Sequence, residues 1–276
     1  MKPFLDISRW FSGIAVAVAL SAPAHAGAPC GGDFDAWLAE FHREAAAQGI
    51  SERAIAAGLD GITPDPAVLS RDRAQRVFTQ TFEQFSGRMI SPDRMRKGTQ
   101  LLNRNAAMFE RIEHQFGVPG PVLVAIWGLE TDFGVNQGKF SIIRSVLTLA
   151  HDCRRPDKFR SELFEALRIV DAGDMTPAEL HGDWAGEIGQ TQFLPSSYLK
   201  YGVDFDGNGK RDLIHSSADA LASTANYLKG YGWRAGEPWD EGSANFNVIL
   251  EWNKAKVYAK TIAAYADRLA AATGTR

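Results

Sequence analysis

The stretch Pro119-Gly-Pro-Val-Leu-Val-Ala-Ile-Trp-Gly-Leu-Glu-Thr-Asp-Phe-Gly134 carries the strongest helix signal in the chain. Prolines suit the first turn of a helix, where a missing N–H costs nothing, and Gly134 suits its exit. The apolar residues share one face at helical spacing, and Glu130 lies on the flank of that face. A carboxyl group there is either paired or raised in pKa, and a raised pKa is what a general acid needs near neutral pH. The alternative is a glutamate at a helix end that simply reaches water.

Composition and the N-terminal residues indicate an exported globular protein. The chain has 276 residues, 45% of them hydrophobic, with a net charge of −3 and no basic run, so we expect no nucleic acid partner. Lys2 and Arg9 precede the apolar run Trp10–Leu20, and Ala24-His-Ala26 fits the small-x-small cleavage rule. We therefore predict a signal peptide over residues 1–26, a periplasmic location and no transmembrane segment in the remaining chain.

The two cysteines, Cys30 and Cys153, both follow the predicted signal peptide. An exported chain with two cysteines favours a disulfide. This bridge would tie the new N-terminus to the segment after the central helix, and closing so long a loop could add roughly 4–5 kcal/mol of stability. The alternative is an N-terminal lipid on Cys30, although the preceding Gly-Ala-Pro is a poor lipidation signal.

Caps and apolar periodicity predict a mostly α chain with glycine-rich joints. Besides the central helix, we expect helices over residues 33–49, 52–58, 71–86, 91–117, 157–175, 216–231 and 253–272. Asp157 is the expected cap of the fifth of these, and Thr176-Pro-Ala-Glu179 has the form of a capping box. The stretch from Gly232 to Asn247 has low regularity and is where we expect short strands.

A second informative stretch is Trp184-Ala-Gly-Glu-Ile-Gly-Gln-Thr-Gln-Phe-Leu-Pro-Ser-Ser-Tyr198. Its small residues would let a ligand or a neighbouring helix approach the backbone. Neutral polar groups beside aromatic faces are typical of sugar-binding sites, and this stretch offers two glutamines and three aromatic rings. The alternative is a tightly packed turn and helix.

The segment Asp204-Phe-Asp-Gly-Asn-Gly-Lys-Arg-Asp212 follows the ligand spacing of an EF-hand loop at positions 1, 3 and 5, with glycine at position 6. Position 12 is His215 rather than glutamate, so the usual bidentate ligand is absent. We predict a structural Ca²⁺ site, against the alternative of a solvated acidic turn. The candidate ligands are Asp204, Asp206, Asn208, Lys210 through its backbone carbonyl, and Asp219 as the replacement for position 12.

Together these motifs resemble the lytic murein transglycosylases of the membrane-bound B type. Ala125–Gly134 is similar to their Glu-Thr-x-Tyr-Gly motif, and Ala185–Tyr198 is similar to their second motif. Asp204–Gly209 is similar to their calcium loop, and Ser223–Trp233 is similar to the helix that follows this loop. The resemblance runs from about Phe34 to the C-terminus in the same order.

The resemblance implies a mainly α fold of the α+β class, with a lysozyme-like catalytic core, an associated α-helical domain and an EF-hand-like loop. We place the helical domain at residues 27–117 and the core at residues 118–276, which include the calcium loop at 204–219 and the C-terminal helix.

The resemblance also implies roles for individual residues. Glu130 matches the catalytic acid of the family. Gln192 and Tyr227 match residues that line the sugar cleft. Asn253 and Tyr258 match an Asn-x-x-x-x-Tyr pair near the acid, which we expect on the last helix.

Other matched positions have alternatives or depart from the family pattern. Arg154 and Arg155 match an arginine pair that can face the peptide stem, and the alternative for both is a surface salt bridge. Asp183 stands where many members have serine, and a charge there would raise the pKa of Glu130 or alter sugar contacts. Glu187 replaces the usual alanine, and Phe133 replaces the usual tyrosine.

A single carboxyl group near the reaction favours a mechanism without water. A hydrolase needs a second carboxylate, but Asp132 points about 200° away around the helix, and Asp183 could approach Glu130 only through folding. In the family chemistry, Glu130 would protonate the oxygen of the β-1,4 bond between N-acetylmuramic acid and N-acetylglucosamine. It would then take the proton from the muramoyl C6 hydroxyl, which closes on C1 to form a 1,6-anhydro end, and no cofactor is needed.

Two other functions stay open. One is a hydrolytic muramidase with Asp183 as base or nucleophile, and the other is a non-catalytic peptidoglycan-binding protein on the same fold. The expected partners are peptidoglycan glycan strands, with cell-wall assembly or secretion complexes as further candidates. A Ca²⁺ sensor is a weaker alternative, because position 12 of the loop lacks a carboxylate.

Overall fold

The computed structural model describes residues 30–75 and 80–275, so the predicted signal peptide lies outside the described residues. Within these ranges the chain forms thirteen helices and one antiparallel pair of two-residue strands. The helices are α1 (Phe34–Ala47), α2 (Glu52–Leu59), α3 (Pro66–Ala74), α4 (Phe82–Met89), α5 (Pro92–Arg104), α6 (Ala106–Phe116), α7 (Gly120–Thr131), α8 (Ile142–His151), α9 (Pro156–Ala172), α10 (Pro195–Tyr201), α11 (Ser217–Gly230), α12 (Ala244–Trp252) and α13 (Lys256–Thr273). The strands are β1 (Phe140–Ser141) and β2 (His181–Gly182). The predicted mainly α class is confirmed.

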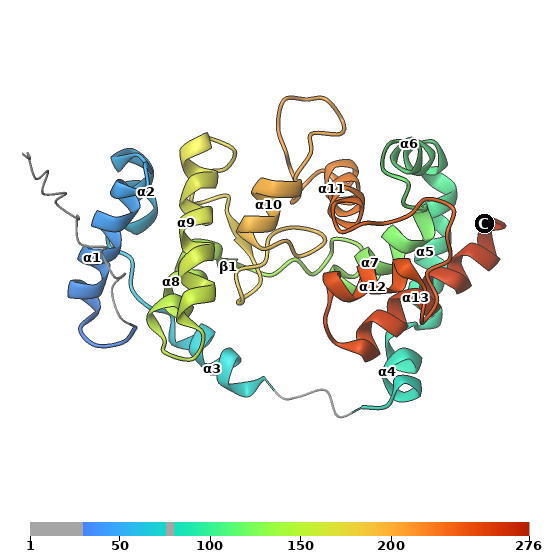
Figure 1. The fold of residues 1–276 in the computed structure, drawn as a ribbon, viewed down its shortest axis with the longest axis horizontal. Helices are drawn as coiled ribbons and strands as arrows, with labels where there is room; N and C mark the ends of the chain where they lie inside the picture. Colours follow the sequence, from blue (N-terminus) through green and yellow to red (C-terminus); the bar gives the residue numbers. More distant parts are fainter. Residues whose placement is uncertain (1–29, 76–79, 276) are drawn as a thin grey trace, which may run out of the picture.

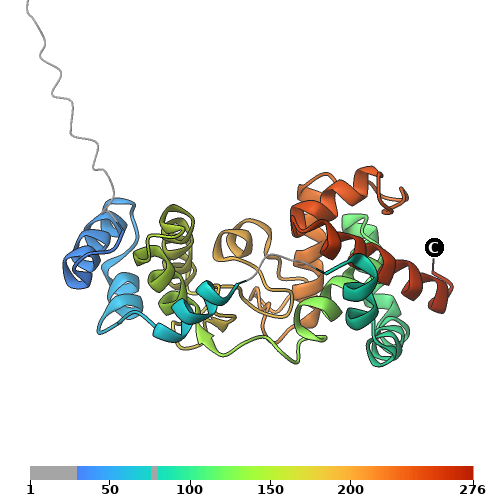
Figure 2. The same cartoon turned by 90° about the horizontal axis from the view of Figure 1, so that it is seen from below.

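The helices are arranged along an elongated molecule. Figures 1 and 2 both show α1 and α2 at one end and the C-terminus at the other. One buried cluster joins α1, α2 and α3 to α8, α9 and α10. The second joins α4, α5 and α6 to α7, α11, α12 and α13. The expected boundary after Gly117 therefore does not coincide with the division of the buried core, because the first six helices contribute to both clusters.

The central helix α7 is buried on almost every side, which fits a sequence that is apolar around most of its circumference. α13 packs along it and also against α12. α7 ends at Thr131, earlier than the Gly134 exit suggested. Three successive residues, Asp132, Phe133 and Gly134, then adopt positive φ angles of 52°, 64° and 82°. This left-handed exit turns the chain away directly after Glu130, and it is strained for the two residues that are not glycine.

Two predicted helices are each divided in two. The helix expected over residues 71–86 ends at Ala74, and α4 begins after Thr81, which forms a capping box with Gln84. Phe78, expected on that helix, lies outside the described residues. The helix expected over residues 91–117 is broken at Asn105, whose side-chain amide donates to the Leu101 carbonyl. In both places side-chain hydrogen bonds satisfy the free backbone groups at a helix end.

Other predicted boundaries were also wrong. Asp157 is not the cap of α9, because Arg155 occupies that position and Pro156 begins the helix. Thr176 and Glu179 form the capping-box hydrogen bonds, but a turn rather than a helix follows them. The short strands expected between residues 232 and 247 are absent from that described stretch.

The last two helices also differ from the prediction. The structure has α12, capped by Ser243, where the sequence had low regularity. α13 begins at Lys256, so Asn253 is the C-cap of α12 and not part of the last helix.

The predicted disulfide between Cys30 and Cys153 is confirmed, with a Cα–Cα distance of 5.2 Å. It joins the segment before α1 to the turn between α8 and α9. The Gly31 N–H also donates to the His151 carbonyl at 2.7 Å. The first described residues are therefore anchored to the cluster formed by α1, α8 and α9.

Candidate active site

Glu130 lies in the last turn of α7, and its side chain is half-buried. The indole N–H of Trp252 donates to Glu130 Oε1 at 2.9 Å, and the Tyr258 hydroxyl also donates to this carboxyl group. Burial raises the pKa of Glu130 to about 7, while the two hydrogen bonds act to lower it. A carboxyl group with this pKa exchanges protons readily near neutral pH.

The two donors to Glu130 come from helices that are distant from α7 in the sequence. Trp252 is the last residue of α12, and Tyr258 lies in the first turn of α13. Asn253 lies between these helices, where its Oδ1 accepts from the Ala255 N–H at 3.0 Å and shapes the turn. The sequence analysis missed Trp252, although it directly precedes Asn253 and therefore flanks the predicted pair.

Asp132 does not pair with Glu130. Its carboxylate contacts Arg94 at 3.3 Å and Lys97 at 3.6 Å, both on α5. The predicted absence of a close pair is therefore confirmed, but Asp132 is the left-handed C-cap of α7 and not a residue of the helix as predicted. Its ion pairs hold this exit of α7 against α5.

Folding brings a second carboxyl group, that of Glu187, toward Glu130. Burial raises the pKa of Glu187 to about 8, and the negative charges of Glu130 and Asp183 add to the rise, while Lys158 and Arg155 oppose it. Glu187 in turn acts electrostatically on Tyr258. The site therefore contains an acidic pair that the position of Glu187 in the sequence did not reveal.

Asp183 is half-buried on the same loop as Glu187. Burial raises its pKa, and hydrogen bonds from the Trp184 and Ala185 backbone N–H groups act in the opposite direction. Asp183 is not among the causes that raise the pKa of Glu130, because burial raises it and the charge of Asp183 acts on Glu187. The alternative effect of Asp183, on sugar contacts, stays a prediction.

The loop that carries these acids is held by close backbone approaches. Ile188 forms antiparallel bridges with both Gly182 and Phe193, and the Asp183 N–H donates to the Glu187 carbonyl at 2.9 Å. A side chain at Gly189 would lie 2.3 Å from the Leu213 carbonyl oxygen. The small residues of this stretch therefore allow the protein to pack on itself, as the packed-turn alternative expected.

The two glutamines of the loop make internal hydrogen bonds. The Gln190 side chain donates to the Ile214 carbonyl at 3.1 Å, and the Gln190 carbonyl accepts from the Thr131 hydroxyl at the end of α7. Gln192 has a φ of 59° and donates to the Gly189 carbonyl at 2.8 Å. Gln190 thus joins α7 to Ile214, which follows the predicted calcium loop, and Gln192 stabilises the turn in which it lies.

Aromatic rings pack beside Trp252. The ring of Phe193 lies 5.5 Å from that of Trp252, and the ring of Tyr227 lies 5.0 Å from it, both edge to face. The Tyr227 hydroxyl donates to the Glu251 carbonyl at 3.0 Å. Phe133 packs edge-on against Trp127 at 5.7 Å, so the ring that replaces the usual tyrosine has an apolar neighbour.

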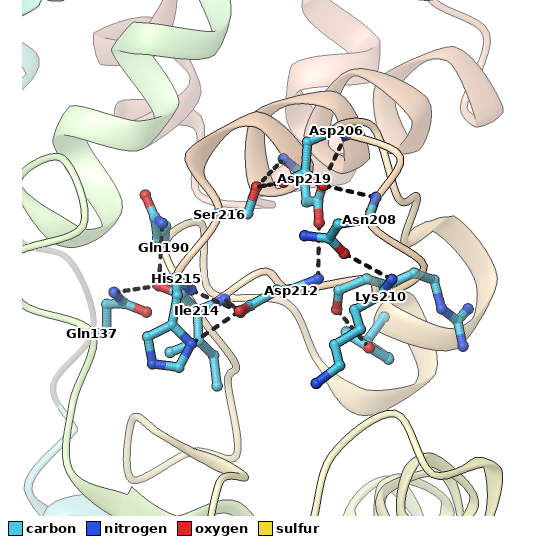
Figure 3. Close-up of polar contacts among 12 residues, drawn as sticks. Gln137, Gln190, Asp206, Asn208, Lys210, Asp212, Ile214, His215, Ser216 and Asp219 are labelled. Carbon is cyan, nitrogen blue, oxygen red and sulfur yellow. Dashed lines mark hydrogen bonds and ion pairs between the residues drawn. The ribbon is translucent and has the colours of Figure 1, made fainter.

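The predicted calcium loop brings together two carboxylates from the segment between α10 and α11 and one from the first turn of α11. Figure 3 shows two of them, Asp206 and Asp219. Asp204, Asp206 and Asp219 each offer one oxygen atom, and these atoms lie within 4.8 Å of one another. Asp219 is buried and accepts from three backbone N–H groups of the loop. An all-oxygen donor set of this kind fits a hard cation such as Ca²⁺.

Positions 5, 7 and 12 of the calcium loop are Asn208, Lys210 and His215. The Asn208 Oδ1 accepts from the Lys210 N–H at 2.9 Å, which forms a tight turn. His215, at position 12, contacts Asp212 with 3.0 Å between its Nδ1 and the Asp212 Oδ2, so position 12 contributes no carboxylate (Figure 3).

The transglycosylase SLT domain family matches residues 33–242. The chain belongs to this family. Over 151 residues, which are 54% of this chain, it is 36% identical to the membrane-bound lytic murein transglycosylase B of Escherichia coli K12, and it spans only 42% of that relative's length.

Solved structures of SLT-domain proteins share the fold. SltB3 of Pseudomonas aeruginosa, in complex with NAG-NAM-pentapeptide, is 33% identical with a TM-score of 0.80, covering 86% of this chain and 79% of that one. The Escherichia coli lytic transglycosylase Slt35, in complex with calcium, is 25% identical with a TM-score of 0.78, covering 92% of this chain and 100% of that one. The predicted resemblance and fold class are confirmed.

The arginine pair of this SLT-domain protein makes the salt bridges that the sequence analysis left as an alternative. Arg154 and Arg155 both contact the carboxylate of Asp72, which is only 1% exposed, on α3. Burial acts to raise the pKa of Asp72, but the hydrogen bonds and charges of the two arginines hold it below its usual value. The pair therefore fastens α3 to the turn beside the disulfide, and its contact with a peptide stem stays a prediction.

None of the helices in the part of the chain that the structure describes has the length and apolar composition needed to cross a membrane.

Proposed function

We propose that this SLT-domain protein is a lytic transglycosylase. It cleaves the β-1,4 bond between N-acetylmuramic acid and N-acetylglucosamine in peptidoglycan and leaves 1,6-anhydromuramoyl ends. The observation that carries the proposal is the setting of Glu130, a half-buried carboxyl group with a pKa of about 7 that accepts two neutral hydrogen bonds. One group with such a pKa can donate a proton and then take one back. Structures of SltB3 in complex with NAG-NAM-pentapeptide and with NAG-anhNAM-pentapeptide support the substrate class.

The reaction uses Glu130 twice. The protonated carboxyl group donates its proton to the glycosidic oxygen as the bond from that oxygen to C1 of the muramoyl residue breaks. The resulting carboxylate accepts the proton of the C6 hydroxyl, and the C6 oxygen forms the new bond to C1. The N–H of Trp252 and the O–H of Tyr258 stabilise the carboxylate between the two steps, because both are neutral donors already in place.

The matched residues around Glu130 would hold the sugars. Tyr227 packs against Trp252, and Asn253 directly follows Trp252, while Gln192 and Asp183 would reach the sugars from the loop that carries Glu187. Arg154 and Arg155 would contact the peptide stem from the far side of the loop, with Asp72 keeping them in position. No cofactor enters this chemistry.

The predicted calcium loop would hold Ca²⁺ in a structural role. Asp204, Asp206, Asn208 and Asp219 supply side-chain oxygens, and Lys210 supplies its backbone carbonyl. The ion would fix the start of α11, the helix that carries Tyr227, and would take no part in proton transfer.

We infer that residues 1–26 direct export and that the protein acts in the periplasm, where its substrate lies. The predicted division into a helical domain over 27–117 and a core over 118–276 stays a proposal. Binding to cell-wall assembly or secretion complexes is a further proposal that follows from the substrate class.

A hydrolytic muramidase is the second candidate function, because Glu187 lies close enough to Glu130 to interact with it electrostatically, and Asp183 acts in the same way on Glu187. A second carboxylate could activate water, which would attack C1 in place of the C6 hydroxyl. The product would then carry a reducing muramic acid end.

Mass spectrometry of the fragments released from purified sacculi tests both functions. The transglycosylase predicts fragments lighter by one water than hydrolysis products, and it predicts that Glu130→Gln abolishes their release while the protein remains folded. Reducing ends would favour the muramidase. Tight binding to sacculi with no fragments from the unmodified protein would leave only a peptidoglycan-binding role.

A further inference from the structure

A row of aromatic rings leads from the catalytic carboxyl group to the protein surface. Trp252 begins the row, because its indole N–H donates to Glu130 Oε1 at 2.9 Å. Tyr227 comes next, with its ring 5.0 Å from that of Trp252. Tyr231 ends the row, with its ring 4.6 Å from Tyr227 and tilted by 32°. We call these three residues the aromatic row.

Tyr231 differs from the other members of the row in its exposure. Trp252 and Tyr227 are half-buried, whereas Tyr231 is 42% exposed. Among the described residues, the other large apolar side chain that is exposed is Val135. A single exposed apolar side chain is common and needs no explanation, but Tyr231 continues a row of rings that starts at the reactive group.

Hydrogen bonds hold the row in place. The Tyr227 hydroxyl donates to the Glu251 carbonyl at 3.0 Å, and the Tyr231 N–H donates to the Tyr227 carbonyl at 3.1 Å at the end of α11. Tyr201 packs against both tyrosines, at 4.9 Å from Tyr227 and 5.8 Å from Tyr231. The Tyr201 carbonyl accepts from the Asn226 side chain at 3.0 Å. Rings that are already ordered lose little conformational freedom when a ligand binds.

We propose that Tyr231 is a stacking platform for a sugar of the glycan strand that lies beyond the two sugars joined at the cleaved bond. The apolar C–H face of a pyranose ring fits an exposed aromatic ring, and the phenol hydroxyl can still reach sugar hydroxyls. A glycan strand is the occupant because the row is continuous with the carboxyl group that protonates the glycosidic bond. This inference rests on the proposed function.

The platform makes affinity depend on strand length. A disaccharide that occupies only the positions beside Glu130 would not reach Tyr231, whereas a longer strand would cover it. An aromatic contact contributes about 0.5–1.5 kcal/mol, so the gain in affinity from a disaccharide to a long strand should fall roughly two- to thirteenfold in Tyr231→Ala. Binding energy from remote sugars also supports the chemical step, so kcat/KM on long strands should fall with it.

The experiment measures binding of peptide-free glycan strands of increasing length by isothermal titration calorimetry, in the full chain carrying Glu130→Gln so that no strand is cleaved. Tyr231→Ala is compared with Tyr231→Phe, which keeps the ring and should restore the length dependence. Val135→Ala is the matched control, because it removes the other exposed apolar side chain outside the row. Circular dichroism spectra establish that each variant is folded.

Three results would overturn the inference. The length dependence could be the same in Tyr231→Ala as in the parent, or Tyr231→Phe could fail to restore it. Tyr231→Ala could instead change only self-association, measured by analytical ultracentrifugation, which would assign the ring to a protein contact. If the parent binds no glycan of any length, the proposed function fails as well, whereas glycan binding and cleavage with an unaltered length dependence would refute only the role of Tyr231.

Discussion

Replacing Trp252 by phenylalanine tests how the protein sets the acidity of Glu130. The ring remains, but the N–H that donates to Glu130 Oε1 at 2.9 Å is lost. This donor favours the carboxylate, so its removal destabilises the charged form and raises the pKa of Glu130 above about 7. A hydrogen bond to a charged group contributes roughly 1.5–3 kcal/mol, and one pKa unit corresponds to about 1.4 kcal/mol. Since Tyr258 still donates to the carboxyl group, we expect a rise of about one unit.

The assay is the pH dependence of kcat/KM for release of anhydro fragments. The first step needs protonated Glu130, so activity is lost as the pH rises through its pKa, and the variant should keep its activity to a pH about one unit higher. The plateau rate should fall about tenfold, because the carboxylate formed during the reaction is less stabilised. The measurement is repeated with Glu187→Gln in both proteins, because the Glu187 carboxyl titrates at a pKa of about 8.

Trp233→Phe is the matched control. It also removes an indole N–H, which donates to the Gly117 carbonyl at 2.9 Å in another part of the structure. This control should lower stability without moving the alkaline limb of the profile. If the limb of Trp252→Phe stays in place or moves to lower pH, then the indole N–H does not stabilise the charged form of Glu130, and the argument for its role is wrong.

Three further predictions concern stability. The raised pKa of Glu187, about 8, means that folding favours its protonated form. This contribution to stability is full below the ordinary pKa of 4.5 and is lost as the pH rises to about 8, so Glu187→Gln should gain about 1–2 kcal/mol relative to the parent between pH 6 and pH 8 in thermal unfolding. Adding Ca²⁺ at about a hundred times its Kd should stabilise the protein by about 2.7 kcal/mol, and Asp219→Asn should remove most of that gain; an equal gain in the variant would place the ion elsewhere. Asp72→Ala leaves Arg154 and Arg155 without their buried partner, so the free energy of unfolding measured with denaturant should fall by about 1–3 kcal/mol. An unchanged free energy of unfolding would mean that water hydrates both guanidinium groups as well as Asp72 binds them.

Local features of the fold could be predicted because their causes lie within a few residues. The apolar pattern of residues 119–134 identified α7, and Ser91 with Pro92 and Gly117 marked the two ends of the α5–α6 segment. The breaks at Asn105 and after Ala74 could not be predicted, because apolar spacing continues across both. At the first, the Asn105 side chain donates to the Leu101 carbonyl, and after the second, Thr81 and Gln84 cap the helix that begins next. α12 was missed because its stretch follows an irregular loop and its pattern is short.

The candidate site likewise has features that local sequence predicts and features that only folding produces. The sequence by itself determined the position of Glu130 on α7, the spacing of the carboxylates in the predicted calcium loop and the pairing of the only two cysteines. Each of these depends on which residues are present and on their spacing along the chain. The tertiary structure decided how acidic Glu130 is, because its donor Trp252 lies 122 residues away and reaches it only when α13 packs against both α7 and α12. It also decided that Glu187 lies close enough to this acid to interact with it electrostatically, on a loop held by the bridges of Ile188 with Gly182 and Phe193. Burial and distant neighbours set a pKa, and neither can be read from local spacing.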